Sequence, residues 1–185
     1  LSPRVLARDQ KYSEIRAYTT SYRDDIDRSI RFLLNYLEDR SETIDGPIVD
    51  CGCGIGRNAI PLARSGHQVI GLEHSAVALR LLQENLGEDA LTGTLTTQQH
   101  DLNEPLPIDD NFAAVVLDIT AVDNLVDAEL RGGYGREVGR ILQPGGVAMV
   151  ATFARNDGYY GPWLKGSPWQ EEGVVEDPNT GIRNK

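Results

Sequence analysis

The chain has 185 residues, of which 40% are hydrophobic and 6% aromatic, and its formal net charge is −10 at pH 7. This length predicts one domain with a single sizeable core. No apolar run approaches the roughly 20 residues that span a bilayer, and no signal-peptide core precedes the first polar segment, so we expect a cytoplasmic protein without membrane association. The acidic balance argues against a dedicated nucleic-acid binder, because such proteins present basic surface to phosphates.

The first 45 residues are expected to form a helical cap. Residues 1–20 are polar and weakly patterned, whereas apolar residues recur at the spacing of one helical face between residues 22 and 40. Ser21, with Asp24 three positions later, has the spacing of a helix N-terminal cap. The sequence therefore predicts a helix over 22–40 that begins at Ser21.

Strand-like and helix-like segments alternate between residues 46 and 154. The expected strands are 47–52, 67–73, 94–101, 111–120 and 146–154. The expected helices are 57–66, 75–87 and 124–142. Strands that alternate with helices imply right-handed crossovers, so we expect an α/β fold with a doubly wound, mostly parallel sheet and helices on both faces.

Residues 155–185 are expected to form a third segment, near the acceptor site. Residues 156–170 are rich in Gly, Pro, Tyr and Trp and indicate a loop, and residues 173–185 favour a hairpin that turns at "DPNTG". The aromatic residues of this segment either wall an acceptor pocket or pack against the sheet, and the sequence leaves both open: Tyr159, Tyr160, Trp163 and Trp169.

The stretch "VDCGCGIGRN", residues 49–58, follows the first predicted strand and holds both cysteines of the chain. Its glycines would let the backbone turn sharply and approach a ligand, and the helix that opens near Asn58 would offer free amides. No Cys/His cluster completes four zinc ligands around Cys51 and Cys53. The stretch therefore predicts a nucleotide loop and no metal site.

Seventeen positions after Gly56, Glu73 ends the second predicted strand, where a carboxylate can accept both hydroxyls of a ribose. Two cofactor classes fit this spacing. Gly54, Gly56 and Ala59 form the G-x-G-x-x-A pattern of dinucleotide sites, which would suit an NAD(P)-dependent oxidoreductase. Counted from Asp50, the same loop is D-x-G-x-G-x-G.

In this second frame the loop resembles the first motif of the class I methyltransferases that use S-adenosylmethionine (SAM). The resemblance continues along residues 47–154, through "GLEHS", "QQHDLNEPLP", "FAAVVLDIT" and "REVGRILQPGGVAMVATF". The string "GIGRN" is also similar to the tellurite-resistance type of methyltransferase. The order and spacing of these segments favour SAM over NAD and imply a Rossmann-like fold.

The resemblance implies a set of cofactor-binding residues: Asp50, Gly52, Cys53, Gly54, Gly56, Asn58, Glu73, His74, Asp101, Leu102 and Asp118. In it, Gly52, Gly54 and Gly56 form the floor of the site, and Asp50 orients the methionine end. Glu73 holds the ribose and His74 lines the adenine pocket.

The resemblance also implies that Asp101 and Leu102 read adenine, and that Asp118 lies where strand four opens toward the methyl group. Asp101 capping a turn, and Asp118 as a structural hydrogen-bond acceptor, remain alternatives. Three tyrosines of the N-terminal segment would either close over the cofactor or pack: Tyr12, Tyr18 and Tyr22.

The resemblance implies transfer of a methyl group, with S-adenosylhomocysteine (SAH) as product. A small-molecule acceptor is expected, because the chain is acidic and "DITA" stands where amino-methylating DNA enzymes carry Asn/Asp-Pro-Pro-Tyr. No catalytic residue is nominated, since a base is needed only for an acceptor that loses a proton. The chain runs out before the helix and strands six and seven that close the family's sheet. It is expected to be a fragment, or else a reduced form whose sheet edge another chain covers, which keeps open a homo-oligomer or a non-catalytic partner subunit.

Overall fold

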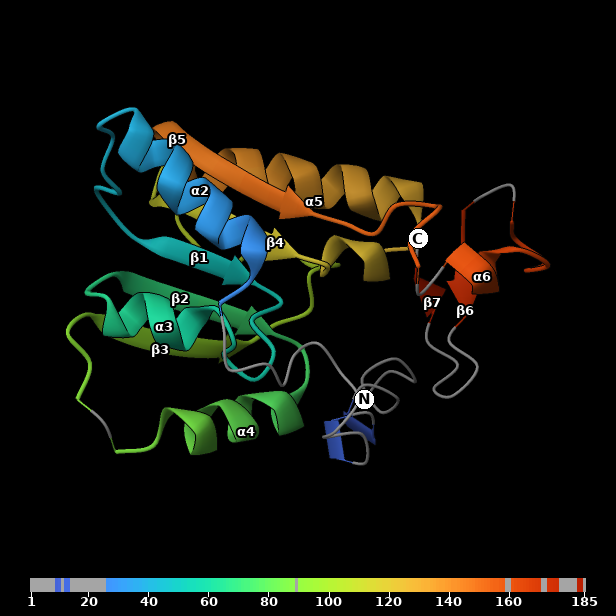
Figure 1. Cartoon of the computed structure of the whole chain (residues 1–185), viewed down its shortest axis with the longest axis horizontal. Coiled ribbons are helices and arrows are strands. Elements are labelled where there is room, and N and C mark those ends of the chain that lie inside the picture. The colour runs from blue at the N-terminus through green and yellow to red at the C-terminus, as the bar shows by residue number, and fades with distance from the viewer. Residues whose placement is uncertain are drawn as a thin grey trace.

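The computed structural model describes residues 9–10, 12–13, 26–88, 90–158, 161–170, 173–176 and 183–184. At its centre lies a five-stranded sheet in the order β3-β2-β1-β4-β5, in which every pair is parallel (Figure 1). The strands are β1 (Ile48–Cys51), β2 (Gln68–Glu73), β3 (Thr94–Gln99), β4 (Ala113–Ile119) and β5 (Leu142–Ala151). The predicted doubly wound α/β fold is confirmed.

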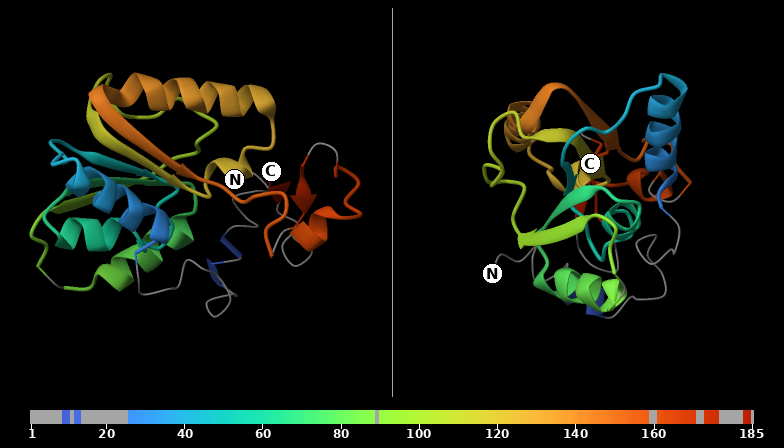
Figure 2. Two further views of the ribbon diagram at one scale, coloured as in Figure 1. Left: turned by 45° about the horizontal axis from the view of Figure 1, so that its top comes forward. Right: turned by 90° about the vertical axis from the view of Figure 1, so that its left-hand side faces the viewer.

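Helices cover both faces of the sheet (Figure 2). The helices are α2 (Arg28–Asp39), α3 (Ala59–Arg64), α4 (Ala76–Leu86) and α5 (Ala128–Ile141). Successive residues of β1 serve opposite faces: Ile48 belongs to the cluster with α2 and α3, and Val49 to the cluster with α5. Both side chains are buried, as expected for a central strand of a parallel sheet.

The strand order reverses at β1: β2 and β3 are added on one side of it, and β4 and β5 on the other. This is the switch point at which open α/β sheets bind ligands, beyond the carboxyl ends of the strands. Cys51 pairs with Asp118 in register, so β1 and β4 end together there. The short 3₁₀ helix η2 (Val122–Asn124) follows β4 at the same edge.

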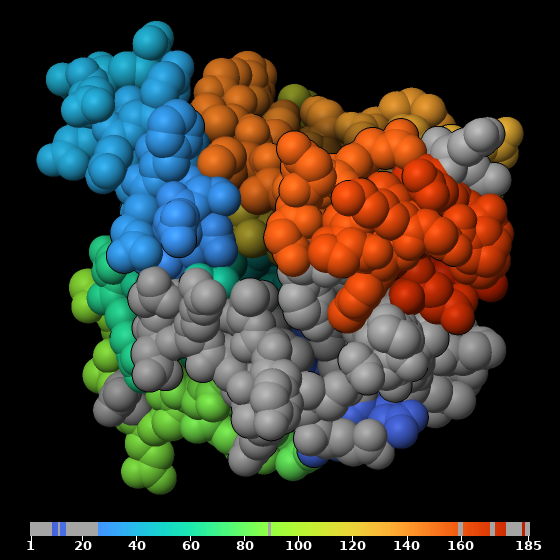
Figure 3. Space-filling model, turned by 45° about the vertical axis from the view of Figure 1, so that its right-hand side comes forward, coloured from blue at the N-terminus to red at the C-terminus, as the bar shows by residue number. Residues whose placement is uncertain are grey.

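The C-terminal segment contains more structure than the loop predicted from the sequence. Residues 161–164 form one helical turn, α6 (Gly161–Leu164), and the amide of Gly161 donates to Asp157 Oδ1 at 3.3 Å. β6 (Val175–Glu176) and β7 (Arg183–Asn184) pair antiparallel, which confirms the hairpin, although its "DPNTG" turn lies outside the described residues. With the carboxyl edge brought forward, Figure 3 shows residues from 161 onward gathered beside it in orange and red.

The predicted helix start, Ser21, lies outside the described residues, and an unbroken helix over 22–40 is wrong because residues 26–27 are not helical. The helix begins at Arg28, because the Asp27 side chain caps it by accepting from the Ser29 amide at 2.9 Å. β5 also begins earlier than predicted, at Leu142, since Leu142 pairs with Ala113 before an irregularity precedes the Val115–Val147 pair. Among the described residues, β5 pairs only with β4 and forms an edge of the sheet.

Candidate functional site

The three glycines of the loop after β1 adopt the left-handed backbone region, with φ of +77° at Gly52, +54° at Gly54 and +88° at Gly56. A Cβ at Gly52 would lie 2.5 Å from Ala121 Cβ, so this glycine lets the segment before η2 pack on the loop. A Cβ at Gly56 would lie 2.7 Å from Ile60 Cδ1, inside the contact with α3. Two of the glycines are therefore required by packing, whatever else they bind.

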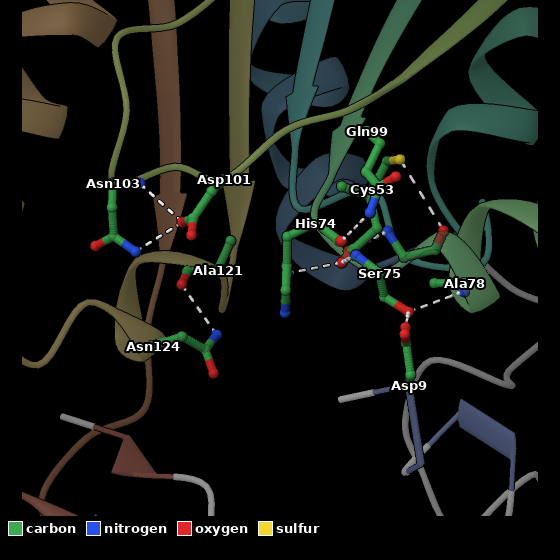
Figure 4. A network of polar contacts seen from close by, with 12 residues as sticks. Asp9, Cys53, His74, Ser75, Ala78, Gln99, Asp101, Asn103, Ala121 and Asn124 are labelled. Atoms are coloured by element: carbon green, nitrogen blue, oxygen red, sulfur yellow. Dashed lines mark hydrogen bonds and ion pairs between the residues drawn. The ribbon is translucent and has the colours of Figure 1, made fainter. Parts of the chain in front are cut away.

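Glu73 joins the end of β2 to this loop. Its carboxylate is 5% exposed, and Oε2 accepts a 3.1 Å hydrogen bond from the Gly54 amide. Oε1 accepts from the Ser75 amide at 2.9 Å and lies 2.9 Å from His74 Nδ1 (Figure 4). The structure thus brings the expected ribose-binding carboxylate onto the glycine loop.

Asp50, at the end of β1, is 2% exposed. Its Oδ2 is buried and has no hydrogen-bond partner within the described part of the chain. Burial, together with the charges of Asp118 and Glu73, raises the pKa of Asp50 to about 7. A buried carboxylate with an open acceptor is suited to a cationic donor, because such a donor would satisfy the oxygen and offset the cost of burial.

Asp118, at the end of β4, has hydrogen-bond donors on both oxygens and no exposure. Oδ2 accepts from the Tyr134 hydroxyl at 2.7 Å, and Oδ1 accepts from the amides of Ala121 and Val122 at 2.9 and 3.0 Å. Burial raises the pKa of Asp118, and these hydrogen bonds oppose that shift. The geometry supports the structural alternative, in which Asp118 holds the turn into η2.

Asp123 of η2 is a buried carboxylate that the sequence reasoning missed. It is 3% exposed, and its Oδ2 has no hydrogen-bond partner within the described residues. Burial and the nearby charge of Asp118 raise the pKa of Asp123 to about 7, against a hydrogen bond from the Phe153 backbone. No sequence pattern distinguishes it from a solvated acid, because its burial depends on the segment after β5.

Asp101 and Leu102 follow β3, and in Figure 4 Asp101 lies on the opposite side of the view from Ser75. Asp101 Oδ1 accepts from the amide and the side chain of Asn103 at 3.0 and 2.6 Å, which is the turn-capping geometry weighed as an alternative. Leu102 packs against the core cluster beneath α5. The adenine-reading roles of both residues remain predictions.

The side chains of Cys53 and Asn58 contact the core and the start of α2. Cys53 belongs to the core cluster of α2 and α3. Asn58 Oδ1 accepts from the Asp27 amide at 3.0 Å, and Arg57 Nη1 lies 3.1 Å from Asp27 Oδ2. The Asn58 and Arg57 side chains hold Asp27 at the start of α2, and the Cys53 side chain lies in the core. A cofactor contact from Cys53 or Asn58 would therefore come from the backbone.

Tyr12 lies over the glycine loop, because a Cβ at Gly54 would come within 3.1 Å of its hydroxyl. The ring is 7% exposed and packs with a small cluster: Ile55, Ala78 and Leu81. Nearby, Asp9 accepts a hydrogen bond from the Ser75 hydroxyl. Packing accounts for Tyr12, while Tyr18 and Tyr22 lie outside the described residues.

The aromatic residues of the C-terminal segment are described only in part. The Arg183 guanidinium carbon lies 4.1 Å from the centre of the Trp169 ring, so Trp169 packs within its own segment. Tyr159 and Tyr160 lie outside the described residues, and the choice between pocket wall and packing stays open for Trp163.

The two cysteines are free, and both are buried. Burial raises the pKa of the Cys51 thiol to about 12 and also raises that of Cys53, so both stay protonated near neutral pH. In the portion of the chain that the structure describes, no three His, Cys, Asp or Glu residues are grouped to hold a metal ion. No helix in that portion is long and apolar enough to cross a membrane.

Comparison with known proteins identifies the family. A sequence model described as "Methyltransferase domain" matches residues 48–146, which include the glycine loop, Glu73, Asp101 and Asp118. The chain belongs to the class I methyltransferase family. The matched range ends within β5, so the family assignment rests on the sheet and its carboxyl edge.

Two relatives of the methyltransferase have named activities. The 2-heptyl-1-hydroxyquinolin-4(1H)-one methyltransferase of Mycobacteroides abscessus is 30% identical over 110 residues, which cover 60% of this chain and 47% of that protein. A ubiquinone biosynthesis O-methyltransferase of Mesorhizobium japonicum is 28% identical over 109 residues, 58% of this chain and 41% of that protein. The methyltransferase chain thus spans less than half the length of either relative.

A SAM-dependent methyltransferase from Methanosarcina mazei has a similar solved structure. It superposes with a TM-score of 0.68 at 24% identity, and the match covers 86% of this chain and 77% of that one. At this identity the likeness supports the fold, which agrees with the Rossmann-like arrangement described above.

Proposed function

We propose that this chain binds SAM at the carboxyl edge of its sheet and transfers the methyl group to a small-molecule acceptor. The observation that carries the proposal is the buried Asp50 Oδ2, which has no partner among the described residues; burial and the charges of Asp118 and Glu73 raise the pKa of Asp50. The ammonium and sulfonium groups of SAM are cationic and suit this acidic edge. The pyrophosphate of a dinucleotide is anionic and would be repelled.

The residues present fit the cofactor in parts. Asp50 would hold the ammonium group, and Glu73, which already lies on the Gly54 amide, would hold the ribose. Gly54 gives the centre of the loop its left-handed backbone, beneath the Tyr12 hydroxyl. Asp101 would receive the adenine amine through Oδ2, since the Asn103 donors occupy Oδ1.

SAM supplies a methyl group on a positively charged sulfur, which an acceptor can attack in line. The chain's own task is to align the two reactants and exclude water. η2 is placed to help, because Ala121 packs on Gly52 and Asp118 holds the turn that leads into it. A proton acceptor is needed only if the attacking atom carries a proton.

A hydroxylated small molecule is the acceptor class that we propose. The names of the two relatives support it, since one acts on a 1-hydroxyquinolinone and the other is an O-methyltransferase. The net charge of −10 adds support, because it disfavours a polyanionic nucleic acid. A cytoplasmic location and a homo-oligomer remain predictions.

Calorimetric titration with SAH tests the cofactor. We expect micromolar or tighter binding of SAH, no binding of NAD, and at least about a tenfold loss of SAH affinity in Glu73→Ala, since hydrogen bonds to a charged group contribute about 1.5–3 kcal/mol. Glu84→Ala is the matched control, because Glu84 is exposed and pairs with Arg80 on α4. Unchanged SAH affinity in Glu73→Ala would refute the ribose assignment.

Activity is tested with SAM and 2-heptyl-1-hydroxyquinolin-4(1H)-one, with SAH release as the readout. Stabilisation by NAD(H) but not by SAH in a thermal-shift screen would instead favour the oxidoreductase hypothesis, in which Gly54, Gly56 and Ala59 form a dinucleotide-binding loop. SAH binding without methyl transfer to any hydroxylated acceptor would favour the non-catalytic partner subunit.

A further inference from the structure

The His74 ring lies against the carboxylate that the proposed function assigns to the ribose. Its Nδ1 lies 2.9 Å from Glu73 Oε1, and the His74 side chain is 27% exposed whereas that of Glu73 is 5% exposed. Two lone pairs at this distance would repel, so Nδ1 carries a proton and donates it to Glu73. The histidine therefore occupies part of the acceptor capacity of this carboxylate.

Three nitrogens already lie at the Glu73 carboxylate: the Gly54 amide donates to Oε2, the Ser75 amide donates to Oε1, and His74 Nδ1 is in ion-pair contact with Oε1 at 2.9 Å. A carboxylate accepts about four hydrogen bonds. A ribose diol brings two further donors, which exceed what remains. One of the three protein donors must leave when a nucleoside binds.

Two of these donors are held in place by the backbone. Gly54 lies in the loop that packs under Tyr12, and Ser75 is the N-cap of α4, where its hydroxyl accepts from the Ala78 amide at 3.0 Å. His74 is the side-chain donor, and rotation about its side-chain torsions is enough to break its bond. Gln99 Nε2 donates to the His74 carbonyl at 2.9 Å, which holds the backbone while the ring turns.

We infer that His74 acts as an exchangeable occupant of the ribose position: it donates to Glu73 in the free protein and is displaced by the ribose diol when SAM or SAH binds. This inference rests on the proposed function. In Figure 4 the far end of the His74 ring points toward the space between Asn124 and Asp9. The displaced ring can then lie along the adenine, which is the place expected for His74 from the sequence.

The exchange weakens the binding of SAM and SAH alike, because each must first break the His74–Glu73 hydrogen bond. Removing the donor while keeping an aromatic ring should therefore tighten binding. His74→Phe keeps a ring and lacks the donor, whereas His74→Asn keeps a donor at the position of Nδ1 and lacks the ring.

Calorimetry with SAH on the purified chain provides the first test. We expect His74→Phe to bind SAH about fivefold more tightly than the wild type, as the loss of one competing hydrogen bond of about 1 kcal/mol implies, and His74→Asn to bind more weakly. A His74→Phe chain that binds SAH no more tightly than the wild type overturns the inference.

Nitrogen-15 NMR of the histidine rings provides a test on the wild-type chain, which has only three histidines. We expect the His74 ring to hold its proton on Nδ1 in the free protein and to lose this preference at saturating SAH. A His74 ring that keeps its Nδ1 proton while other site resonances shift overturns the inference and leaves the proposed function standing. No response to SAH at any resonance overturns both.

Discussion

The Tyr134 hydroxyl donates a 2.7 Å hydrogen bond to Asp118 Oδ2, which joins α5 to the carboxyl end of β4. Tyr134 is 5% exposed and Asp118 is fully buried, so the bond lies in the core behind the candidate site. Burial raises the pKa of Tyr134, and its hydroxyl therefore remains a donor at every physiological pH. This contact, together with the hydrogen bonds that the Ala121 and Val122 amides donate to Asp118, holds the segment that leads into η2.

Removal of this hydroxyl should destabilise the fold. We expect Tyr134→Phe to lower the free energy of unfolding by about 1–3 kcal/mol, because a buried carboxylate oxygen loses its donor. Urea denaturation measures the change. Tyr36→Phe serves as the control, since Tyr36 is 44% exposed and the loss there should stay within about 0.5 kcal/mol. Equal effects in the two variants would contradict the structural role of Asp118.

The raised pKa of Asp50 makes stability depend on pH. Because the folded-state pKa is about 7 and the ordinary value is near 4, the folded state holds a proton that the unfolded chain has released between these pH values. The free energy of unfolding should therefore fall as pH rises from about 4 to about 7. Asp123, with a pKa of about 7, acts in the same direction.

Asp50→Asn should remove its share of this dependence. We expect the variant to be more stable than the wild type by about 4 kcal/mol at pH 8 and equal to it near pH 4, since the pKa is raised by about three units and each unit corresponds to about 1.4 kcal/mol. Urea denaturation at both pH values is the measurement. A variant no more stable than the wild type at pH 8 would show that the buried carboxylate carries no such cost.

The same group should make cofactor binding depend on pH. A cationic ammonium group favours ionised Asp50, so SAH should bind up to about tenfold more tightly at pH 8 than at pH 6. Asp50→Asn should bind SAH weakly and with little pH dependence, whereas Asp123→Asn should retain the dependence. Calorimetry at the two pH values decides, and a flat wild-type profile would remove Asp50 from the cofactor site.

Gly56 should tolerate no side chain. Its φ is +88°, and a Cβ would lie 2.7 Å from Ile60 Cδ1 and 2.9 Å from Leu82 Cγ. We expect Gly56→Ala to lower the free energy of unfolding by about 2–4 kcal/mol through backbone strain and overpacking.

Gly135→Ala provides the matched control for this glycine. Gly135 lies inside α5, and a Cβ there would meet no atom within 4 Å. We expect a gain of about 0.5–1 kcal/mol, because alanine is the better helix former. A loss of stability in Gly135→Ala comparable to that in Gly56→Ala would contradict the packing argument.

The alternation of strands and helices could be predicted from the sequence, because buried parallel strands are continuous apolar runs and helix ends carry their own signals. Ser75 and Gly87 were expected to bound one helix, and they are the N-cap and C-cap of α4. The start of α2 could not be predicted, because its cap, Asp27, is held in place by contacts with Arg57 and Asn58, about thirty residues later in the chain.

From the sequence, the resemblance to class I methyltransferases pointed to the family, while local periodicity and spacing predicted the sheet and the order of the glycine loop, Glu73 and Asp101. Only the tertiary structure decided which carboxylates are buried and which have partners. Among the described residues, Asp50 and Asp123 each keep one oxygen without a partner, Asp118 accepts from Tyr134, and Glu73 lies in contact with His74. These differences arise because a side chain's hydrogen bonds depend on neighbours from distant strands and helices, which spacing along the chain does not encode.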